Sequence, residues 1–259
     1  MDKDAVLAAY DQQMRRNAQP DGPGAVVERA DGVVRQTAAD SSGWNGVIWS
    51  DLDQDTADAA IAAQVEHFAS AGNEFEWKLY SHDRPTDLTE RLLAAGFEPE
   101  PEETLLVAEV AGLPAEAELP KGVHLLPVTD PAGVELVADV HKQAFGGNAD
   151  RFKQQLLAQL SGNPDTVVAV VAMAGELPVS AARMELYPGT DFVGLWGGGT
   201  VPAWRGQGIY RALVAFRTRI AAERGYRYVQ VDASEQSRPI LQRLGFVPLS
   251  TTTPYLYTA

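Results

Sequence analysis

The chain of 259 residues contains no cysteine and only four histidines. Without cysteine it forms no disulfide, no Cys-ligated zinc site, no iron–sulfur cluster and no thiol nucleophile. The histidines, which show no metal-ligand spacing, give no indication of a bound metal; they are His67, His82, His124 and His141. No apolar run approaches the roughly 20 residues that a membrane span needs. We therefore expect no metal and no membrane association.

The first sixteen residues, MDKDAVLAAYDQQMRR, are rich in charge and lack the apolar stretch of a signal peptide. This pattern predicts a cytoplasmic protein. Apolar residues make up 45% of the chain, which is enough for packed cores and argues against wholesale disorder.

Basic residues are scarce in the first part of the chain. Residues 1–120 carry 8 basic and 24 acidic side chains, a formal charge of −16, whereas residues 121–259 carry 13 and 11, a charge of +2. The asymmetry predicts two units with different roles, the second able to accept an anion. Nucleic acid is not expected as a partner, because the first unit would repel phosphates.

The boundary between the units is predicted at AGLPAEAELPK, residues 111–121, where two prolines enclose a short acidic stretch without apolar periodicity. We therefore predict a first domain over 1–112, a linker over 113–120 and a second domain over 121–259.

Apolar periodicity and turn residues predict the elements of both domains. In the first we expect helices over Asp4–Arg16, Thr56–Ala71 and Leu88–Ala95, a hairpin over Val26–Val34, and strands over Trp44–Ser50, Phe75–Tyr80 and Thr104–Val110. In the second we expect strands over Val123–Pro127, Thr166–Met173, Leu177–Tyr187, Phe192–Val201, Arg227–Asp232 and Val247–Tyr257, and helices over Asp130–Phe145, Asp150–Leu160, Gly208–Arg224 and Pro239–Leu244. The fold class is α/β (α+β), with a mixed, mostly antiparallel sheet flanked by helices.

A weak repeat relates the two domains. Gly96-Phe97 recurs 149 residues later as Gly245-Phe246, and at the same offset Asp83 matches Asp232. This register overlays the strand that ends at Asp83 on the strand that ends at Asp232, which indicates a duplication. The repeat fails where Arg205–Tyr210 falls on Thr56–Ile61, so only the second copy has glycines before its helix.

Glycines between a strand and a helix let backbone N–H groups approach an anion. The helix that follows adds unpaired N–H donors and the positive end of its dipole. Arg205 and Arg211 lie beside Gly206 and Gly208 and can add positive charge. The spacing fits neither the Rossmann fingerprint nor the P-loop, which disfavours a nucleotide hydrolase. The segment is predicted to bind a diphosphate.

This segment resembles the acyl-CoA pyrophosphate loop, Arg/Gln-x-x-Gly-x-Gly/Ala, of the GCN5-related N-acetyltransferase (GNAT) family. Tyr210 departs from it, since Gly or Ala is usual there. The resemblance implies two tandem acyl-CoA N-acyltransferase folds, of which the first is degenerate and lacks the pyrophosphate loop. It also implies acetyl-CoA as co-substrate, held by Thr200, Val201, Arg205, Gly206, Gln207, Gly208, Ile209, Tyr210 and Ser234.

The resemblance further implies that the strand Phe192–Val201 parts from Arg227–Asp232 to admit pantetheine like an added strand. Gly197-Gly198-Gly199 lies in the first of these strands. The glycines mark either a bulge that bends the strand or a place where missing side chains admit the ligand.

Catalytic groups are less evident, because Leu241 stands where many members of the family have a tyrosine acid. The candidates for acid and base are Glu185, Asp191 and Tyr255. The resemblance implies transfer of an acetyl group to a small amine or peptide by direct attack in a ternary complex. The alternative is a non-catalytic acyl-CoA-binding or interaction protein. The acceptor and the oligomeric state stay open.

Overall fold

The computed structural model describes residues 1–40 and 43–258. Contacts divide the chain into two compact units. Unit 1 contains Met1–Leu106, Asp232–Ile240 and Pro248–Ala259, and unit 2 contains Val107–Val231 and Leu241–Val247. Residues from the end of the chain therefore pack in unit 1. The boundaries 1–112 and 121–259 between two copies of a fold stay a prediction, because compact units need not coincide with duplicated segments.

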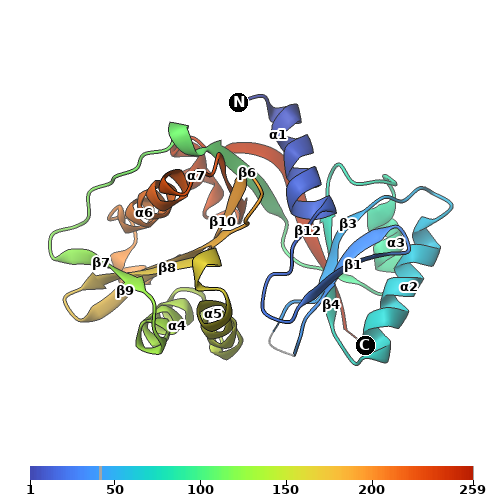
Figure 1. Ribbon diagram of the computed structural model, residues 1–259, viewed down its shortest axis with the longest axis horizontal. Helices are drawn as coiled ribbons and strands as arrows, with labels where there is room; N and C mark the ends of the chain where they lie inside the picture. Colours follow the sequence, from blue (N-terminus) through green and yellow to red (C-terminus); the bar gives the residue numbers. More distant parts are fainter. Residues whose placement is uncertain (41–42, 259) are drawn as a thin grey trace. The chain divides into compact units, whose positions relative to one another are not determined.

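Unit 1 has three helices among its described residues, in the order that the sequence predicts (Figure 1). These are α1 (Lys3–Tyr10), which continues as a π-helical turn over Asp11–Arg16, α2 (Ala57–Ser70) and α3 (Leu88–Ala94). Its strands are β1 (Val26–Ala30), β2 (Val33–Thr37), β3 (Gly46–Ser50), β4 (Phe75–Tyr80), β5 (Glu98–Pro99) and the greater part of β12 (Val247–Tyr257).

The strands of unit 1 follow the order β1-β2-β3-β4-β12. β12 runs antiparallel to β4, with Tyr255 opposite Trp77. Both side chains are buried in one apolar core, together with Phe68, Phe75 and Phe97. The burial of these aromatic rings explains why the last strand lies in unit 1, since each ring removes a large apolar area from water.

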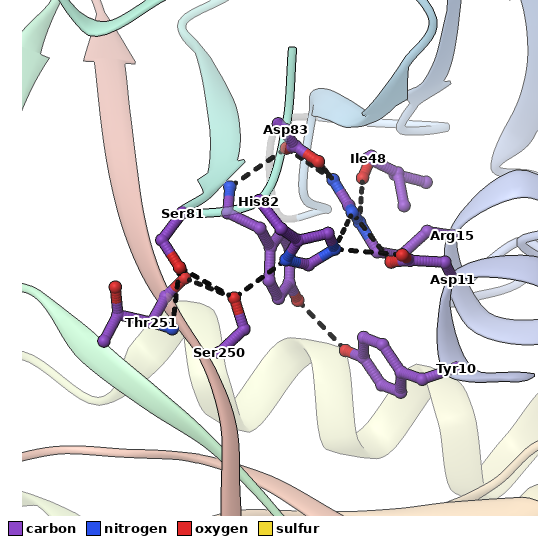
Figure 2. A network of polar contacts seen from close by, with 10 residues as sticks. Tyr10, Asp11, Arg15, Ile48, Ser81, His82, Asp83, Ser250 and Thr251 are labelled. Atoms are coloured by element: carbon purple, nitrogen blue, oxygen red, sulfur yellow. Dashed lines mark hydrogen bonds and ion pairs between the residues drawn. The ribbon is translucent and has the colours of Figure 1, made fainter. Parts of the chain in front are cut away.

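A buried network of polar contacts fixes the N-terminal helix within unit 1 (Figure 2). Arg15 is 1% exposed and donates to both carboxylate oxygens of Asp83, at 2.8 and 2.6 Å. It also pairs with Asp11 at 2.8 Å, and its Nε donates to the carbonyl of Ile48. His82 lies between Asp11 and a serine of β12. The guanidinium is therefore fully matched by acceptors.

Unit 2 contains α4 (Pro131–Phe145), α5 (Asp150–Gly162) and α6 (Ile209–Glu223), with strands β7 (Val123–Val128), β8 (Val167–Ala174), β9 (Leu177–Leu186), β10 (Phe192–Thr200) and the first part of β11 (Tyr228–Ala233). Two further elements have residues in both units, β6 (Glu103–Glu109) and α7 (Arg238–Arg243), and a 3-10 turn over Val110–Gly112 belongs to unit 2.

The strands of unit 2 follow the order β11-β10-β9-β8-β7, antiparallel except for the parallel pair β10–β11. α4 and α5 cover one face of the sheet and α6 the other (Figure 1). Side chains alternate between the faces of a strand. On β9, Ala182 packs toward α6, whereas Arg183 and Glu185 point to the α5 face.

The predicted repeat is confirmed for its helices and only partly for its strands. At an offset of 149, α3 falls on residues 237–243, which are α7 within one residue. The same offset carries β4 onto residues 224–229, four residues before β11 begins at Tyr228. The prediction that the strands overlay without a gap is therefore wrong, because the turn that follows β4 is longer.

The described residues were also compared with the requirements of a membrane span and of a metal site. Among them, no helix combines the length and apolar composition needed to cross a membrane. In the same part of the chain, no three His, Asp or Glu side chains gather in a way that could hold a metal ion.

Candidate active site

The loop between β10 and α6 presents an open helix N-terminus. Gly206 and Gly208 adopt φ of +76° and +85°, which an L side chain rarely tolerates. Gly208 is the N-cap of α6, and no side chain makes a capping hydrogen bond there. The first N–H groups of a helix have no partner within it and carry the positive end of the dipole. This end of α6 therefore suits an anion.

Arg205 braces this loop. Its Nε donates to the carbonyl of Thr200 at 3.0 Å, and its Nη2 donates to the carbonyl of Ala144 at 3.1 Å. Gln207 donates to the carbonyl of Ala203 at 3.4 Å. Both side chains therefore hold the backbone of the loop, and the N–H groups remain the donors that face an anion.

Three other predicted residues anchor the loop to the sheet. Thr200 Oγ1 lies 2.8 Å from Ser180 Oγ, and the N–H of Val201 donates to Val179. Ile209 is 1% exposed in an apolar cluster, against which Leu119 of the predicted linker also packs. The predicted linker is thus part of unit 2, and Leu119 packs beside the start of α6.

The departure at Tyr210 is explained by Gly198. A Cβ on Gly198 would lie only 2.9 Å from Cε2 of the Tyr210 ring, so the ring occupies the space that the glycine leaves. Gly197 has φ of +57°, and the β9–β10 register shifts between Trp196 and Gly199. The bulge predicted at this glycine run is confirmed. The missing side chains make room for the protein's own aromatic rings.

β10 and β11 part after a short pairing. Their parallel register covers Phe192–Gly194 against Tyr228–Gln230, although β10 continues to Thr200. Beyond Gly194, no further β10–β11 register pair occurs among the described residues. Beyond Gly194, this edge of β10 therefore lacks a register pair with β11, which is the arrangement that an added extended strand requires.

A chain of hydrogen bonds lies on the α5 face where β10 and β11 part. Glu185 stands opposite Gly194 and accepts from the Tyr187 hydroxyl at 3.0 Å. Tyr187 in turn accepts from Trp196 Nε1 at 3.3 Å. A Cβ on Gly194 would lie 2.5 Å from Trp196 Nε1 and 2.7 Å from Gln230 Nε2. Only glycine at 194 therefore lets these polar groups converge.

Two more side chains complete the surroundings of Glu185. Gln159 of α5 donates to Oε1 at 3.3 Å, and Arg183 Nη2 lies 3.4 Å from the same oxygen. The Glu185 side chain is 14% exposed. A largely buried carboxylate held by Tyr187 and Gln159 has a defined position at which it can accept a proton from a ligand.

The other predicted catalytic and cofactor residues lie elsewhere. Asp191 is exposed at the start of β10, where the backbone is still paired with β11 through Arg227 and Tyr228. Tyr255 is buried in the core of unit 1, with its hydroxyl 3.4 Å from Thr89 Oγ1. Ser234 is exposed in the turn after β11 and also belongs to unit 1.

Sequence reasoning missed most of the polar cluster, which contains Gln159, Arg183, Tyr187 and Gln230 besides Glu185. One signal was available: Arg183, Glu185 and Tyr187 alternate along a predicted strand and must share a face. No sequence pattern indicates the other two residues, Gln159 and Gln230, because they come from a helix and a later strand.

Solved structures of similar fold cover nearly the whole chain. A GCN5-related N-acetyltransferase from Kribbella flavida covers 98% of this chain and 95% of its own, at 20% identity and a TM-score of 0.72. A tandem GNAT protein from the clavulanic acid biosynthesis pathway covers 99% and 95%, at 12% identity and a TM-score of 0.63. A GCN5-related N-acetyltransferase from Sphaerobacter thermophilus covers 98% and 84%, at 14% identity and a TM-score of 0.61. At such identities the likeness shows the fold alone.

No curated protein matches the chain in sequence. The model of the acetyltransferase (GNAT) family matches residues 135–246, which include the β10–α6 loop, Glu185 and Tyr187. The whole chain thus has the fold of a tandem GNAT protein, and residues 135–246 match the model of the acetyltransferase (GNAT) family.

Proposed function

We propose that the protein transfers an acetyl group from acetyl-CoA to an amine by direct attack in a ternary complex. The observation that carries this proposal is the parting of β10 from β11. The parted segment of β10 runs from Gly194, which stands opposite Glu185, toward the loop that ends at Gly208 and the open N-terminus of α6. The Glu185 carboxylate accepts a hydrogen bond from Tyr187. Acetyl-CoA supplies the acetyl group as a thioester.

The residues present fit this ligand. The N–H groups at the start of α6 are proposed to hold its pyrophosphate, because Gly206 and Gly208 keep the loop open and Arg205 braces it. Main-chain groups of β10 beyond Gly194 would bind the pantetheine arm.

Glu185 is the proposed base. An amine must lose a proton as it attacks, and Glu185 is held for this task by Tyr187 and Gln159. A positioned general base contributes about 10²- to 10⁴-fold to a rate. The predicted candidate Asp191 is less suited, since it is exposed before the strands part.

The second candidate function is acyl-CoA binding without turnover. The observation in its favour is Leu241, which is fully buried where the family commonly has a tyrosine. Both functions need the open N-terminus of α6 to bind acyl-CoA, so only an assay of acetyl transfer distinguishes them.

The first step of the test is binding. Acetyl-CoA at about 100 times its Kd should stabilise the protein by about 2.7 kcal/mol. We expect Gly208→Ala to lose this stabilisation. Gly225→Ala is the matched control, because Gly225 also has positive φ with open space around it but follows the other end of α6. Equal thermal shifts in both variants would contradict the pyrophosphate assignment.

The second step is turnover, measured as release of free CoA thiol over a panel of amines. We expect release by the wild type and a loss of about 100-fold or more in Glu185→Gln, with the thermal shift by acetyl-CoA retained. Binding without release for any amine would favour the non-catalytic alternative.

A further inference from the structure

Arg183 is a cation whose hydrogen bonds are incomplete. It lies on β9, opposite Trp196, and its side chain is 16% exposed. Its Nε and Nη1 are buried and have no hydrogen-bond partner among the described residues. Buried donors without acceptors are costly and uncommon in folded proteins. At these two nitrogens Arg183 therefore lacks an acceptor among the described residues.

Glu185 does not supply that acceptor. Its Oε1 lies 3.4 Å from Arg183 Nη2, which is long for a charge-assisted hydrogen bond. The carboxylate is held instead by Tyr187 and Gln159. A cation and an anion thus stand side by side on one face of β9, and each can still form further hydrogen bonds.

This pair matches a zwitterion. In a free α-amino acid the ammonium and the carboxylate are attached to the same carbon, so they can meet two adjacent groups of opposite charge. A guanidinium is well suited to bind a carboxylate. A simple amine or an internal lysine of a peptide would leave Arg183 unmatched.

Aromatic rings lie around Arg183. Its guanidinium carbon is 5.3 Å from the centre of the Phe152 ring, and His141 stacks on Phe152 at 4.7 Å. Phe145 lies next to His141 and is 58% exposed. Burial and the charge of Arg183 lower the pKa of His141, so the ring is neutral near pH 7. These surroundings favour a ligand with an apolar side chain.

We propose that the acetyl acceptor is a free α-amino acid with an apolar side chain, whose carboxylate binds Arg183 and whose amine is presented to Glu185. This inference rests on the proposed function and adds the class of acceptor to it. The chemistry balances: the amine nitrogen bonds to the acetyl carbon, the carbon–sulfur bond breaks, Glu185 takes the proton that nitrogen loses, and the CoA thiolate gains one from solvent.

The test compares phenylalanine and leucine with the amines that lack their carboxylates, phenethylamine and isopentylamine. In the wild type we expect kcat/KM to be about 10- to 100-fold higher for the amino acids, since a hydrogen bond to a charged group is worth about 1.5–3 kcal/mol. Arg183→Met should remove this preference, by lowering the value for the amino acids only. Arg183→Lys should retain part of it, and Arg219→Met, on the exposed part of α6, should retain all of it.

The thermal shift by acetyl-CoA, if retained, shows that each variant is folded. Equal rates for phenylalanine and phenethylamine in the wild type would overturn the inference and leave the proposed function intact. If no amine is acetylated, calorimetric titration of the protein with phenylalanine tests the proposed carboxylate site by itself. Binding that Arg183→Met abolishes would support the carboxylate site, and no binding to the wild type would overturn it.

Discussion

The segments that precede α2 and α6 differ in what holds them. Before α2, the Asp53 carboxylate accepts from the N–H groups of Asp55 and Thr56 and from the Thr56 hydroxyl, at 2.8 to 3.0 Å. At α6, Gly208 is the N-cap and no side chain makes a capping bond, as is also the case at α2. The difference lies in the segment before each helix, since a carboxylate holds the turn before α2, whereas two glycines of positive φ lie in the loop before α6.

The cations inside the two units also differ in the groups with which they are paired. In unit 1, Arg15 is paired with Asp83 and Asp11, and Lys78 forms an ion pair with Asp232. In unit 2, Arg217 is equally buried but donates to backbone carbonyls, and burial lowers its pKa to about 10. These cations of unit 1 are thus paired with carboxylates, whereas Arg217 is held by backbone carbonyls.

The largest effect that would sharpen this comparison is expected from Arg15→Met. It leaves the buried Asp83 carboxylate without its cation, which should cost about 3–5 kcal/mol of unfolding free energy. Arg16→Met, which breaks the exposed pair with Asp51, should cost about 0–1 kcal/mol. Urea unfolding measures both. A loss in Arg217→Met as large as in Arg15→Met would contradict the comparison, because Arg217 has no carboxylate partner among its contacts.

A smaller effect is expected from Gly198→Ala. Its new Cβ would lie 2.9 Å from the Tyr210 ring, and such overpacking costs about 1–3 kcal/mol. Tyr210→Ala in the same chain should remove most of that cost, because the ring is the obstacle. The double-mutant cycle is read from urea midpoints. Additive effects of the two substitutions would show that Tyr210 does not occupy the space beside Gly198.

The smallest effect is expected from Asp53→Ala at the start of α2. Hydrogen bonds from Thr56 hold the pKa of Asp53 below its usual value. A depressed pKa in the folded state adds stability above the unfolded pKa and loses it as the pH falls through the folded pKa. The variant should therefore melt slightly earlier at pH 7, and the difference should vanish in acid. Asp55→Ala is the neighbouring control, and an equal shift there would refute the role of the Asp53 carboxylate in holding the turn before α2.

Local patterns predicted the elements and the loop well. The strand Phe75–Tyr80 was predicted with the observed bounds, and the hairpin turn lies at Asp31-Gly32, where both residues have positive φ. The glycines of the β10–α6 loop could be found because they are neighbours in sequence. The fold of such segments depends on backbone preferences and periodicity, which a single sequence carries.

The partner of the last strand and the polar cluster could not be found in that way. The sequence predicted a strand over Val247–Tyr257 but not its pairing with β4, which depends on aromatic packing across 170 residues of chain or more. It offered Tyr255 as a catalytic candidate, and the fold buries that ring in the core of unit 1.

The α/β class, the position of most elements and the glycines of the loop that we propose to bind an anion can be inferred from the sequence alone. Tertiary structure alone decided which polar side chains meet, because Gln159, Arg183 and Gln230 come from three different elements. It also decided which buried cations have a carboxylate partner. Whether a charge has a partner depends on distances of a few ångströms between segments far apart in the chain, and no local pattern encodes them.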